Sequence, residues 1–577
     1  MRARSSRRRL LTGAAGAAAA AAVAGTVGLA RRSSGSQGPA ATPSPVGLQV
    51  ITPTTPPSAT PTPVPQGGVA RLVSSRGFNF DTFDAARSGE LSTLEVLGRT
   101  HSRLVRWTAG AQTALEPDLA AAWEQPDETT ISFRLAPNAR WQDRPPLAGR
   151  LVSADDVVKH FQRVVELARG GLPAPQRGHE YSTIRRISAP DGGRVLFELA
   201  RPDPFLVYTL AGQFALVQAP GVVEQFGAKL GERRPEHVVG SGPFLYDGPV
   251  NGGALSFTAH RGGHRRPNLD GLTVSPPGAT AEAFARGESD TYLARDRRDA
   301  PLLRARGGFS EAAWFEDSPV VTTVFAGAAP WDNLDLRLAV SAALNRQELA
   351  ARLFGGRAVP AGPIPPVSPA FALSETEIAG YPGYGRLEAD RREARARWEA
   401  GGGPALGGVT VDIPSIFDPL YAASAIVPAM LHEALGAAVR PAVDSYTAIS
   451  ARAVAHRYGN GEARLWFGWG PPLFDPEPSR LLIANFRSGG PGFATTGYRS
   501  EALDRVLDQL AVEFSLERRQ ALAREASRLI LQAGGGGLWS WLQQRSEFFW
   551  RRGFSPAFTV APWYGFDDGA SAFISAM

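Results

Sequence analysis

Alternation of apolar and polar residues predicts strands in this chain. Over residues 130–135 (Thr-Ile-Ser-Phe-Arg-Leu) the two kinds alternate, as they do in a strand with one buried face. Val195, Phe197 and Leu199 repeat the same two-residue period further along the chain. We therefore expect a half-buried strand at each place.

Helical spacing of apolar residues predicts a helix after Ser153. Ser153 and Asp156 have the Ser-x-x-Asp spacing of a capping box. The apolar residues that follow share one helical face: Val157, Val158, Phe161, Val164, Val165 and Ala168. A helix is also predicted over residues 336–354, with Asp335 placed to cap it and Gly355-Gly356 placed to end it.

Further helices are predicted over residues 387–400, 501–512 and 516–532. Strands and helices alternate irregularly, and the sequence has no internal repeat of fixed period. We therefore expect an α/β protein with mixed sheets and helices outside them.

The N-terminal 32 residues have the order of a bacterial export signal. Arg7-Arg8-Arg9 precedes two leucines and an apolar stretch, rich in Ala and Gly, that reaches Ala30. The arginine pair followed by leucines resembles the twin-arginine type, which carries proteins that fold before export. Because the stretch is just long enough to span a membrane, cleavage and retention as an anchor both remain open.

Residues 33–68 are dominated by Pro, Thr, Ser, Gly and Ala. Such a composition cannot form a packed core and favours extended conformations. We expect a semi-rigid linker that holds a folded domain away from a membrane or wall. A dispensable disordered leader is the alternative.

The net charge of +6 does not indicate nucleic-acid binding. Seven arginines within the first 32 residues exceed that value, so the rest of the chain is close to neutral. The basic surface that nucleic-acid binding needs is therefore absent. The sequence also has no cysteine, which excludes disulfides, thiolate metal sites and cysteine nucleophiles.

The sequence offers little catalytic chemistry. It has no phosphate-binding loop, no dinucleotide-binding glycine motif and no Gly-x-Ser-x-Gly turn. His260 and His264 are four residues apart, but Gly262-Gly263 lies between them, so a solvated loop is expected rather than a metal pair. We expect no catalytic residue, no metal site and no cofactor.

Aromatic residues are the more informative candidates. The chain has 12 tryptophans, and Leu465-Trp466-Phe467-Gly468-Trp469 holds two of them. In a strand, Trp466 and Gly468 would point to one face and Phe467 and Trp469 to the other. Aromatic walls suit a small-molecule pocket, and ordinary core packing is the alternative.

Six blocks in order carry a resemblance to a known family. They are Glu116-Pro117-Asp118-Leu119-Ala120 with Trp123, Phe133 to Trp141-Gln142-Asp143, Ala154-Asp155-Asp156-Val157, Gly240-Ser241-Gly242-Pro243-Phe244, residues 337–346, and Gly468-Trp469 through Asp475-Pro476. Over residues 69–577 the chain resembles the extracytoplasmic solute-binding proteins of ABC importers. The resemblance is to the family (family 5) of oligopeptide-, dipeptide- and nickel-binding proteins.

This resemblance implies a two-lobed, type II periplasmic-binding-protein-like fold with a hinged cleft and an additional domain. Domain I would comprise residues 69–110, 240–325 and 545–577. Domain II would comprise residues 111–239, and domain III residues 326–544.

The resemblance also implies a receptor rather than an enzyme. It would capture a small molecule or peptide outside the cytoplasm, as a monomer, and deliver it to an ABC permease and ATPase. An exported hydrolase with an aromatic cleft is one alternative. A surface recognition protein that kept the fold without transport is the other.

Departures from the family pattern bear on the ligand. Peptide-binding members have Gly-Trp-x-x-Asp in the pocket strand, where the Asp pairs with the α-amino group of the peptide. Counted from Trp469, that position is Pro472, and Asp475 matches a second acid of the loop. Asp475 could instead cap the turn before Pro476. The candidate ligand-binding residues are Trp466, Gly468, Trp469, Phe474 and Asp475.

Overall fold

The computed structural model describes most of the chain after the predicted linker. The described residues are 65–74, 78–107, 114–170, 177–294, 296, 298–316, 318–415, 420–458, 463–471, 476–555 and 573–574. The predicted export signal, residues 1–32, and most of the predicted linker, residues 33–68, lie outside them. Within the described ranges, no helix is long and apolar enough to cross a membrane.

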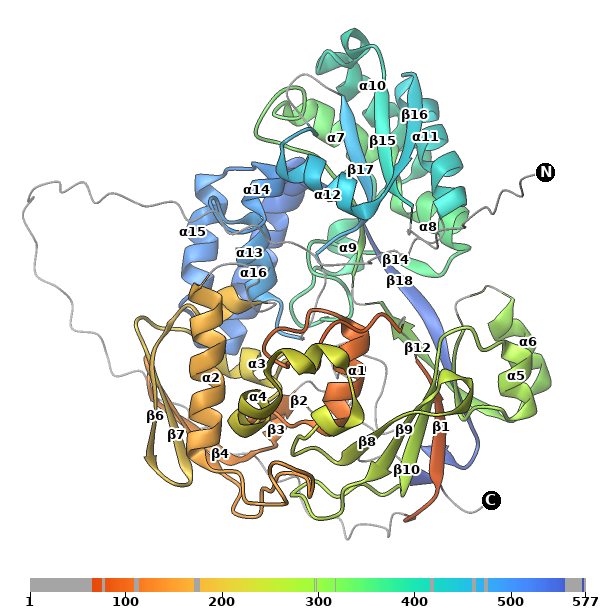
Figure 1. Cartoon of the computed structure of the whole chain (residues 1–577). Helices are drawn as coiled ribbons and strands as arrows, with labels where there is room; N and C mark the ends of the chain where they lie inside the picture. Colours follow the sequence, from red (N-terminus) through yellow and green to blue (C-terminus); the bar gives the residue numbers. More distant parts are fainter. Residues whose placement is uncertain are drawn as a thin grey trace, which may run out of the picture.

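The described chain forms two lobes (Figure 1). The first lobe, in the lower part of the view, comprises the described residues from 65 to 315 and from 545 to 555. The second lobe, above it, comprises the described residues from 320 to 544. The buried clusters of the first lobe draw on residues 70 to 303 with Phe549 and Phe554, whereas those of the second draw on residues 320 to 542.

The first lobe contains two separate four-stranded sheets. One has the order β1-β10-β9-β8, from β1 (Val69–Val73), β8 (Phe244–Pro249), β9 (Leu255–Ala259) and β10 (Gly271–Ser275). The other is antiparallel in the order β4-β5-β7-β6, from β4 (Ala120–Asp127), β5 (Thr130–Leu135), β6 (Ile184–Asp191) and β7 (Arg194–Leu199). The strands predicted around residues 130–135 and 195–199 are confirmed as β5 and β7.

Shorter elements complete the first lobe. Its helices are α1 (Leu91–Thr100), α2 (Ala154–Arg169), α3 (Leu206–Ala211), α4 (Pro220–Phe226), α5 (Ala281–Arg286) and α6 (Asp299–Arg306). Its remaining strands are β2 (Val105–Trp107), β3 (Leu115–Pro117), β11 (Thr291–Ala294), β12 (Phe309–Phe315) and β19 (Phe554–Ser555), which pairs with β20 (Phe573–Ile574).

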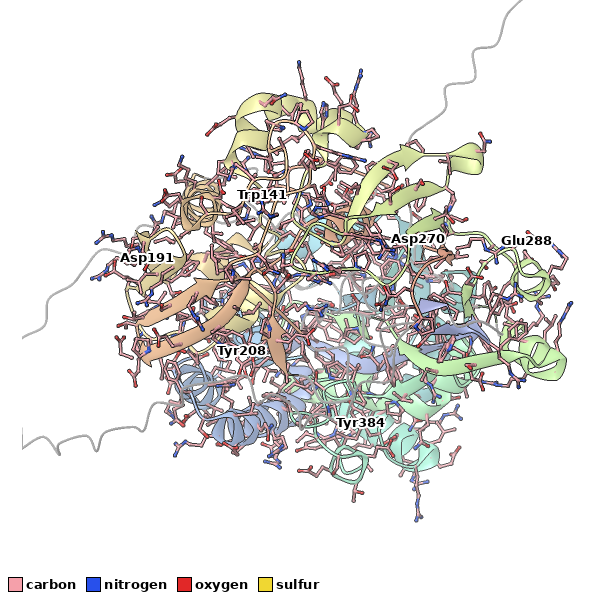
Figure 2. The ribbon with its side chains drawn as sticks, turned by 90° about the horizontal axis from the view of Figure 1, so that it is seen from below. Trp141, Asp191, Tyr208, Asp270, Glu288 and Tyr384 are labelled. Carbon is pink, nitrogen blue, oxygen red and sulfur yellow. The ribbon has the colours of Figure 1, made fainter. Side chains whose placement is uncertain are left out.

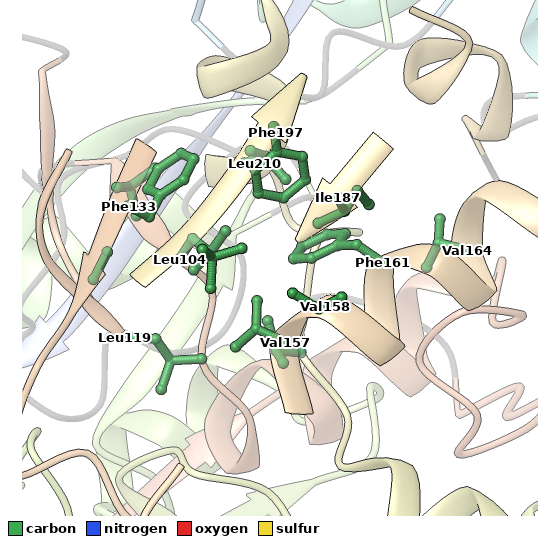
Figure 3. Close-up of a cluster of buried hydrophobic side chains, with 14 of the residues drawn as sticks. Leu104, Leu119, Phe133, Val157, Val158, Phe161, Val164, Ile187, Phe197 and Leu210 are labelled. Atoms are coloured by element: carbon green, nitrogen blue, oxygen red, sulfur yellow. The ribbon is translucent and has the colours of Figure 1, made fainter. Parts of the chain in front are cut away.

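Helix α2 packs its apolar face on the antiparallel sheet (Figure 3). The Phe161 ring meets Phe197 of β7 edge-on at 5.5 Å, and Phe197 meets Phe133 of β5 at 5.7 Å. The predicted capping box is present, because the Asp156 amide donates to Ser153 Oγ at 3.2 Å and the Ser153 amide donates to Asp156 Oδ2 at 3.0 Å. The local pattern therefore fixes both the start of α2 and the face that it buries.

The second lobe surrounds the larger part of an eight-stranded sheet. Its strands are β13 (Val320–Thr323), β14 (Ala358–Pro360), β15 (Val409–Pro414), β16 (Val439–Asp444) and β17 (Arg464–Trp469). Its helices are α7 (Leu334–Ala343), α8 (Arg346–Phe354), α9 (Glu375–Ile378), α10 (Leu387–Ala400), α11 (Leu420–Leu435), α12 (Tyr446–Val454), α13 (Ser479–Phe486), α14 (Phe493–Thr496), α15 (Glu501–Leu510) and α16 (Leu516–Gln532). The predicted helices over residues 387–400 and 516–532 are confirmed, and the one predicted to begin at residue 501 ends two residues early.

The prediction of one helix over residues 336–354 is wrong. The segment forms two helices, because α7 ends at Ala343 and the Asn345 side chain caps α8 by accepting from the Glu348 amide at 3.0 Å. The cap of α7 is also not Asp335. Asn333 accepts from the amides of Asp335 and Leu336 instead, so the helix begins two residues earlier than predicted.

One long strand runs through both lobes. The strand β18 (Leu538–Arg551) pairs with β13 and β14 through its first half and with β11 and β12 through its second. The chain also passes between the lobes from β12 to β13, and there the Glu316 amide donates to the Gln544 carbonyl at 3.1 Å. The two crossing segments therefore lie side by side.

Candidate ligand-binding site

The aromatic run predicted from the sequence is strand β17, next to the crossing segment β13. In this pairing Val320 lies opposite Trp469 and Thr323 opposite Trp466, so β17 ends where β13 enters the second lobe. On its other side β17 pairs in parallel with β15, with Asp412 opposite Trp466. The pocket-strand candidate therefore ends near the point where the lobes connect.

The two tryptophans lie on opposite faces of the sheet, as the strand period predicted. Trp466 is buried in a cluster with Ile449 and Tyr458, and it meets Tyr446 edge-on at 5.8 Å. Trp469 packs against the main core of the second lobe but is only half-buried. Trp466 thus supports the sheet, whereas Trp469 keeps surface that a ligand could cover.

Gly468 is required by close packing in the strand. A Cβ at this position would lie 2.7 Å from the Trp466 indole nitrogen and 3.3 Å from Pro414. A larger residue would push the Trp466 ring out of its cluster. Gly468 therefore positions the aromatic residues and offers no side chain of its own to a ligand.

Two of the five candidates, Phe474 and Asp475, lie outside the described residues, as does Pro472. The segments on either side are anchored in the second lobe. Before it, the Gly470 amide donates to the Pro319 carbonyl at 2.7 Å, and after it, Ser368 Oγ donates to the Pro476 carbonyl at 3.3 Å.

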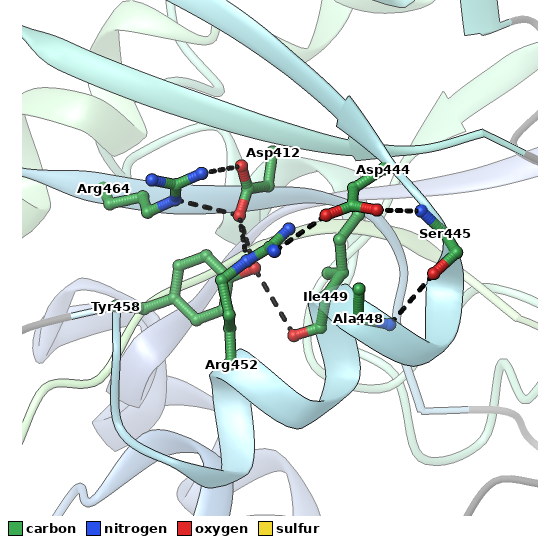
Figure 4. A network of polar contacts seen from close by, with 8 residues as sticks. All are labelled: Asp412, Asp444, Ser445, Ala448, Ile449, Arg452, Tyr458 and Arg464. Carbon is green, nitrogen blue, oxygen red and sulfur yellow. Dashed lines mark hydrogen bonds and ion pairs between the residues drawn. The ribbon is translucent and has the colours of Figure 1, made fainter.

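A buried charge network supports the strands behind Trp466 (Figure 4). The fully buried Asp412 carboxylate accepts from Arg464 at 2.7 and 3.0 Å, from Arg452 at 3.0 Å and from the Tyr458 hydroxyl at 2.8 Å. Arg452 also pairs with Asp444 at 2.8 Å, which joins β15, β16, β17 and α12. A buried carboxylate needs such compensation, because leaving it unpaired is costly.

Burial and the neighbouring charge act together on the titration of this network. Burial, reinforced by the Asp412 carboxylate, raises the pKa of Tyr458, so its hydroxyl stays a donor. Hydrogen bonding to Asp412 raises the pKa of Arg464. Tyr458 therefore stays protonated and Arg464 stays charged at any moderate pH, which suits a rigid support.

The prediction of a solvated loop around His260 and His264 is wrong. His264 Nε2 lies 2.9 Å from the Asp118 carboxylate, and the exposed fractions of these two side chains are 5% and 0%. His260 is also buried, with Nδ1 3.2 Å from the Gly242 carbonyl. Asp118 belongs to the block that begins at Glu116, so the loop packs on a distant segment that the local pattern does not reveal.

No group of three or more His, Asp and Glu side chains in the described parts of the chain is arranged to hold a metal ion. The sequence interpretation also missed Arg480 and Arg519, which reach from the second lobe to Asp203 and Tyr208 of the first. Their partners lie about 300 residues away in sequence, so no spacing rule could have identified them.

A model of the bacterial extracellular solute-binding proteins, family 5 (middle region), matches residues 114–485. This match covers more than half of the chain and includes both lobes. The chain belongs to the family 5 solute-binding proteins.

Curated relatives of this family 5 protein agree with the assignment. The "Probable D,D-dipeptide-binding periplasmic protein DdpA" of Escherichia coli is 27% identical over 53% of this chain and 60% of its own length. The "Probable di/tripeptide-binding protein 5" of Pseudomonas aeruginosa is 25% identical over 78% of this chain and 86% of its own length. The match thus spans less than two thirds of the Escherichia coli protein.

Solved structures show the same fold as this family 5 protein. The Helicobacter pylori periplasmic binding protein DppA, in complex with the peptide STSA, has a TM-score of 0.70 at 18% identity and covers 89% of this chain. The binding protein MoaA of Agrobacterium tumefaciens R10, in complex with mannopinic acid, has a TM-score of 0.67 at 19% identity and the same coverage. The type II two-lobed fold with an additional domain is therefore confirmed.

Proposed function

We propose that this protein is the substrate-binding receptor of an ABC importer. It captures a small polar solute between its two lobes and presents it to a permease and ATPase in the membrane, without chemical turnover. The observation that carries the proposal is family 5 membership of a chain whose lobes are joined by two adjacent crossing segments. Adjacent crossings permit closure by bending at one place.

The ligand would contact the end of β17. Trp469 is half-buried there, and a flat aromatic side chain supplies contact area at a small entropic cost. Phe474 and Asp475 belong to the segment that follows and complete the proposed site, with Gly468 and Trp466 supporting it from the strand. Asp475 would act as partner for a cation or hydroxyl group.

The ligand class follows from Pro472. Proline offers no charge to a peptide α-amino group, and a buried unpaired ammonium costs several kcal/mol, on the order of 3–5. N-blocked peptides or other polar solutes are therefore favoured over peptides with a free amine. The names and titles of relatives include dipeptides and tripeptides, but also mannopinic acid, so the fold accommodates both kinds of ligand.

The organisation around this site would follow the sequence prediction. Domain I comprises residues 69–110, 240–325 and 545–577, domain II residues 111–239 and domain III residues 326–544. The separate sheets and buried clusters of the two lobes support a boundary between domain III and the other two, although β13 (Val320–Thr323) packs in the second lobe. The protein would act as a monomer outside the cytoplasm, reached through the twin-arginine signal, which is either cleaved or kept as a tether.

The test is calorimetry of the purified chain against short peptides in free-amine and N-acetylated pairs, with native mass spectrometry to identify any retained ligand. We expect the acetylated member of a binding pair to bind at least as tightly as the free amine. Binding should reduce the radius of gyration in small-angle scattering, without product release.

Two Trp→Leu variants, one in the proposed site and one outside it, test the role of Trp469 in binding. Trp469→Leu should weaken binding at least about tenfold, because it removes an aromatic contact worth roughly 1.5 kcal/mol. Trp550→Leu changes a half-buried tryptophan of the first lobe and should leave affinity unchanged. Micromolar binding that acetylation abolishes would show that another acid replaces the missing one, and steady product release would place the protein among enzymes.

A further inference from the structure

The two lobes touch at a second place besides the crossing segments. There, Arg480 of α13 reaches the first lobe, and its Nη2 donates to both carboxylate oxygens of Asp203 at 2.9 and 2.8 Å. Its Nη1 donates to the Glu180 carbonyl at 3.1 Å. In Figure 1 this contact, between α13 and the α3 region, lies on the opposite side of the molecule from β18.

The first lobe holds Asp203 ready for this arginine. The Asp203 side chain is 5% exposed and accepts from Thr183 Oγ1 at 2.7 Å and from the Phe205 amide at 3.0 Å. Both donors belong to the first lobe, so the carboxylate keeps its orientation whether or not Arg480 is present. A buried carboxylate also needs a positive partner, and Arg480 of the second lobe forms this ion pair at 2.8 Å.

A second arginine meets the same surface. Arg519 of α16 donates from Nη2 to the Tyr208 hydroxyl at 3.0 Å, and its guanidinium lies 5.4 Å from the Tyr208 ring centre. Figure 2 shows Tyr208 at the boundary between the strands of the first lobe and the helices of the second. Tyr208 is itself stacked on Trp107 at 5.4 Å, with the rings 6° from parallel.

The second lobe in turn holds Arg519 in place. Arg519 pairs with Glu477 at 3.3 Å and donates to the Phe514 carbonyl at 2.8 Å, and both charged side chains are nearly buried. Two apolar residues of the second lobe, Val367 and Leu481, add contacts with the core cluster of the first lobe. Each lobe therefore presents a preformed half of the contact.

This arrangement has the properties of a reversible contact. A buried ion pair contributes little net stability, since desolvation offsets its attraction, but it demands one geometry. On opening, Arg480 and Asp203 would separate, and water would solvate both side chains. Asp203 would keep its hydrogen bond from Thr183, and Arg519 would keep its bond to the Phe514 carbonyl, because each of these partners lies in the same lobe. The contact can therefore specify one arrangement of the lobes without making it irreversible.

We propose that Arg480 and Arg519 form a latch with Asp203 and Tyr208 that holds the two lobes closed, and that its release opens the ligand site. The proposal rests on the proposed receptor function, in which closure retains the solute. It extends that function by placing the control of closure in α13 and α16, opposite the crossing segments.

The absence of native cysteine makes the latch directly measurable in the full chain. Spin labels at Lys159→Cys on α2 and Ala502→Cys on α15 occupy exposed positions, one on each lobe. Double electron–electron resonance without added ligand would then give the distribution of distances between the lobes. We expect a main population at the distance of the present structure.

Arg480→Gln should shift most of that population to longer distances, at least a fivefold loss of the closed fraction. Tyr208→Phe removes one interlobe hydrogen bond and should cause a smaller shift. The exchange Arg480→Asp with Asp203→Arg should restore part of the closed population. Arg487→Gln is the matched control, because Arg487 pairs at 2.6 Å with Asp508 inside the second lobe.

Distances unchanged by Arg480→Gln and Tyr208→Phe would overturn the latch, as would a parent protein that is already open. These outcomes are independent of ligand binding. A chain that binds no solute in calorimetry but opens on Arg480→Gln would contradict the receptor function and leave the latch standing. A chain that binds solute but whose interlobe distances do not change on Arg480→Gln would contradict the latch and leave the receptor function standing.

Discussion

Buried histidines make the first lobe sensitive to acid. His160 of α2 is buried against Phe161 and accepts a hydrogen bond from the Gln218 amide on Nδ1. Burial, aided by the nearby Arg163 charge, lowers its pKa to about 3. Burial likewise lowers the pKa of His101 to about 4. Both groups are therefore neutral in the folded protein at moderate pH.

The stability that depends on His160 has a defined pH window. The unfolded chain binds a proton below a pKa near 6.5, whereas the folded chain does not until about pH 3, so stability falls as pH drops through this range. Between pH 7 and pH 5 the loss is about 2 kcal/mol for such a group. Despite burial, hydrogen bonds from Arg150 and Ser153 hold the pKa of Asp156 below its usual value, so this carboxylate does not contribute to the loss between pH 7 and pH 5.

His160→Asn should flatten this dependence, since the amide oxygen can accept from Gln218 but cannot be protonated. The measurement is the apparent Tm between pH 7 and pH 5 for the parent, His160→Asn and His432→Asn. His432 is exposed, so its variant should follow the parent. A His160→Asn variant that loses as much Tm as the parent on acidification would contradict the assignment.

Local sequence rules predicted side-chain contacts well where the two residues are close in sequence. Ser153 and Asp156 are three residues apart, and their capping box forms as predicted. His264 and Asp118 are 146 residues apart, and their contact was missed. The same limit applies to the candidate site. The strand period of β17 predicted that Trp466 and Trp469 point to opposite faces, but it could not predict which of the two is buried.

At the scale of elements, Asn345 shows why a continuous apolar pattern became two helices. Its side chain caps α8 and also donates to Asp390 at 2.6 Å and to the Gly385 carbonyl at 3.1 Å. The Asn345 amide both caps the start of α8 and donates to a buried carboxylate. These two interactions together outweigh the weak intrinsic preference of the chain to continue α7 as one helix. Propensity and spacing alone carry no information about Asp390.

Asn345→Ala should therefore destabilise α8 more than a cap deletion alone. Loss of the cap costs roughly 1 kcal/mol, and removing one donor from buried Asp390 costs about 1 kcal/mol more, so exchange of α8 amides should accelerate about 30-fold. Ser445→Ala deletes only the exposed cap of α12 and should accelerate exchange there about fivefold, for roughly 1 kcal/mol. Hydrogen exchange by mass spectrometry checks both, and equal effects would show that Asn345 acts only as a cap.

Elements formed by local pattern were predictable, and those formed by distant partners were not. Helices α10 and α16 match their predicted ranges because the local spacing shows the buried face of each, and Ser515 also caps the start of α16. The 14-residue strand β18 was not predicted, because its pairing residues come from β11 to β14, more than 170 residues earlier. Non-local pairing is a property of the whole chain, not of any window within it.

At the scale of the molecule, the first lobe needs both ends of the described chain. Strand β1 begins at Val69, while β18, which pairs with β11 and β12 of the same lobe, ends at Arg551. This lobe can therefore complete its fold only when nearly the whole chain has been made. Such a protein suits a route that exports folded proteins.

The proposed twin-arginine export should require the Arg7-Arg8 pair. Arg7→Lys with Arg8→Lys keeps the charge but loses the planar guanidinium groups that a twin-arginine receptor would bind, so folded protein should accumulate in the cytoplasm. Arg31→Lys with Arg32→Lys makes the same chemical change at the end of the segment and should be exported like the parent. Cell fractionation followed by limited proteolysis measures both location and folding. Export of the Arg7-Arg8 variant at the parent level would mean that the chain crosses unfolded, and completion of the first lobe would then occur outside the cytoplasm.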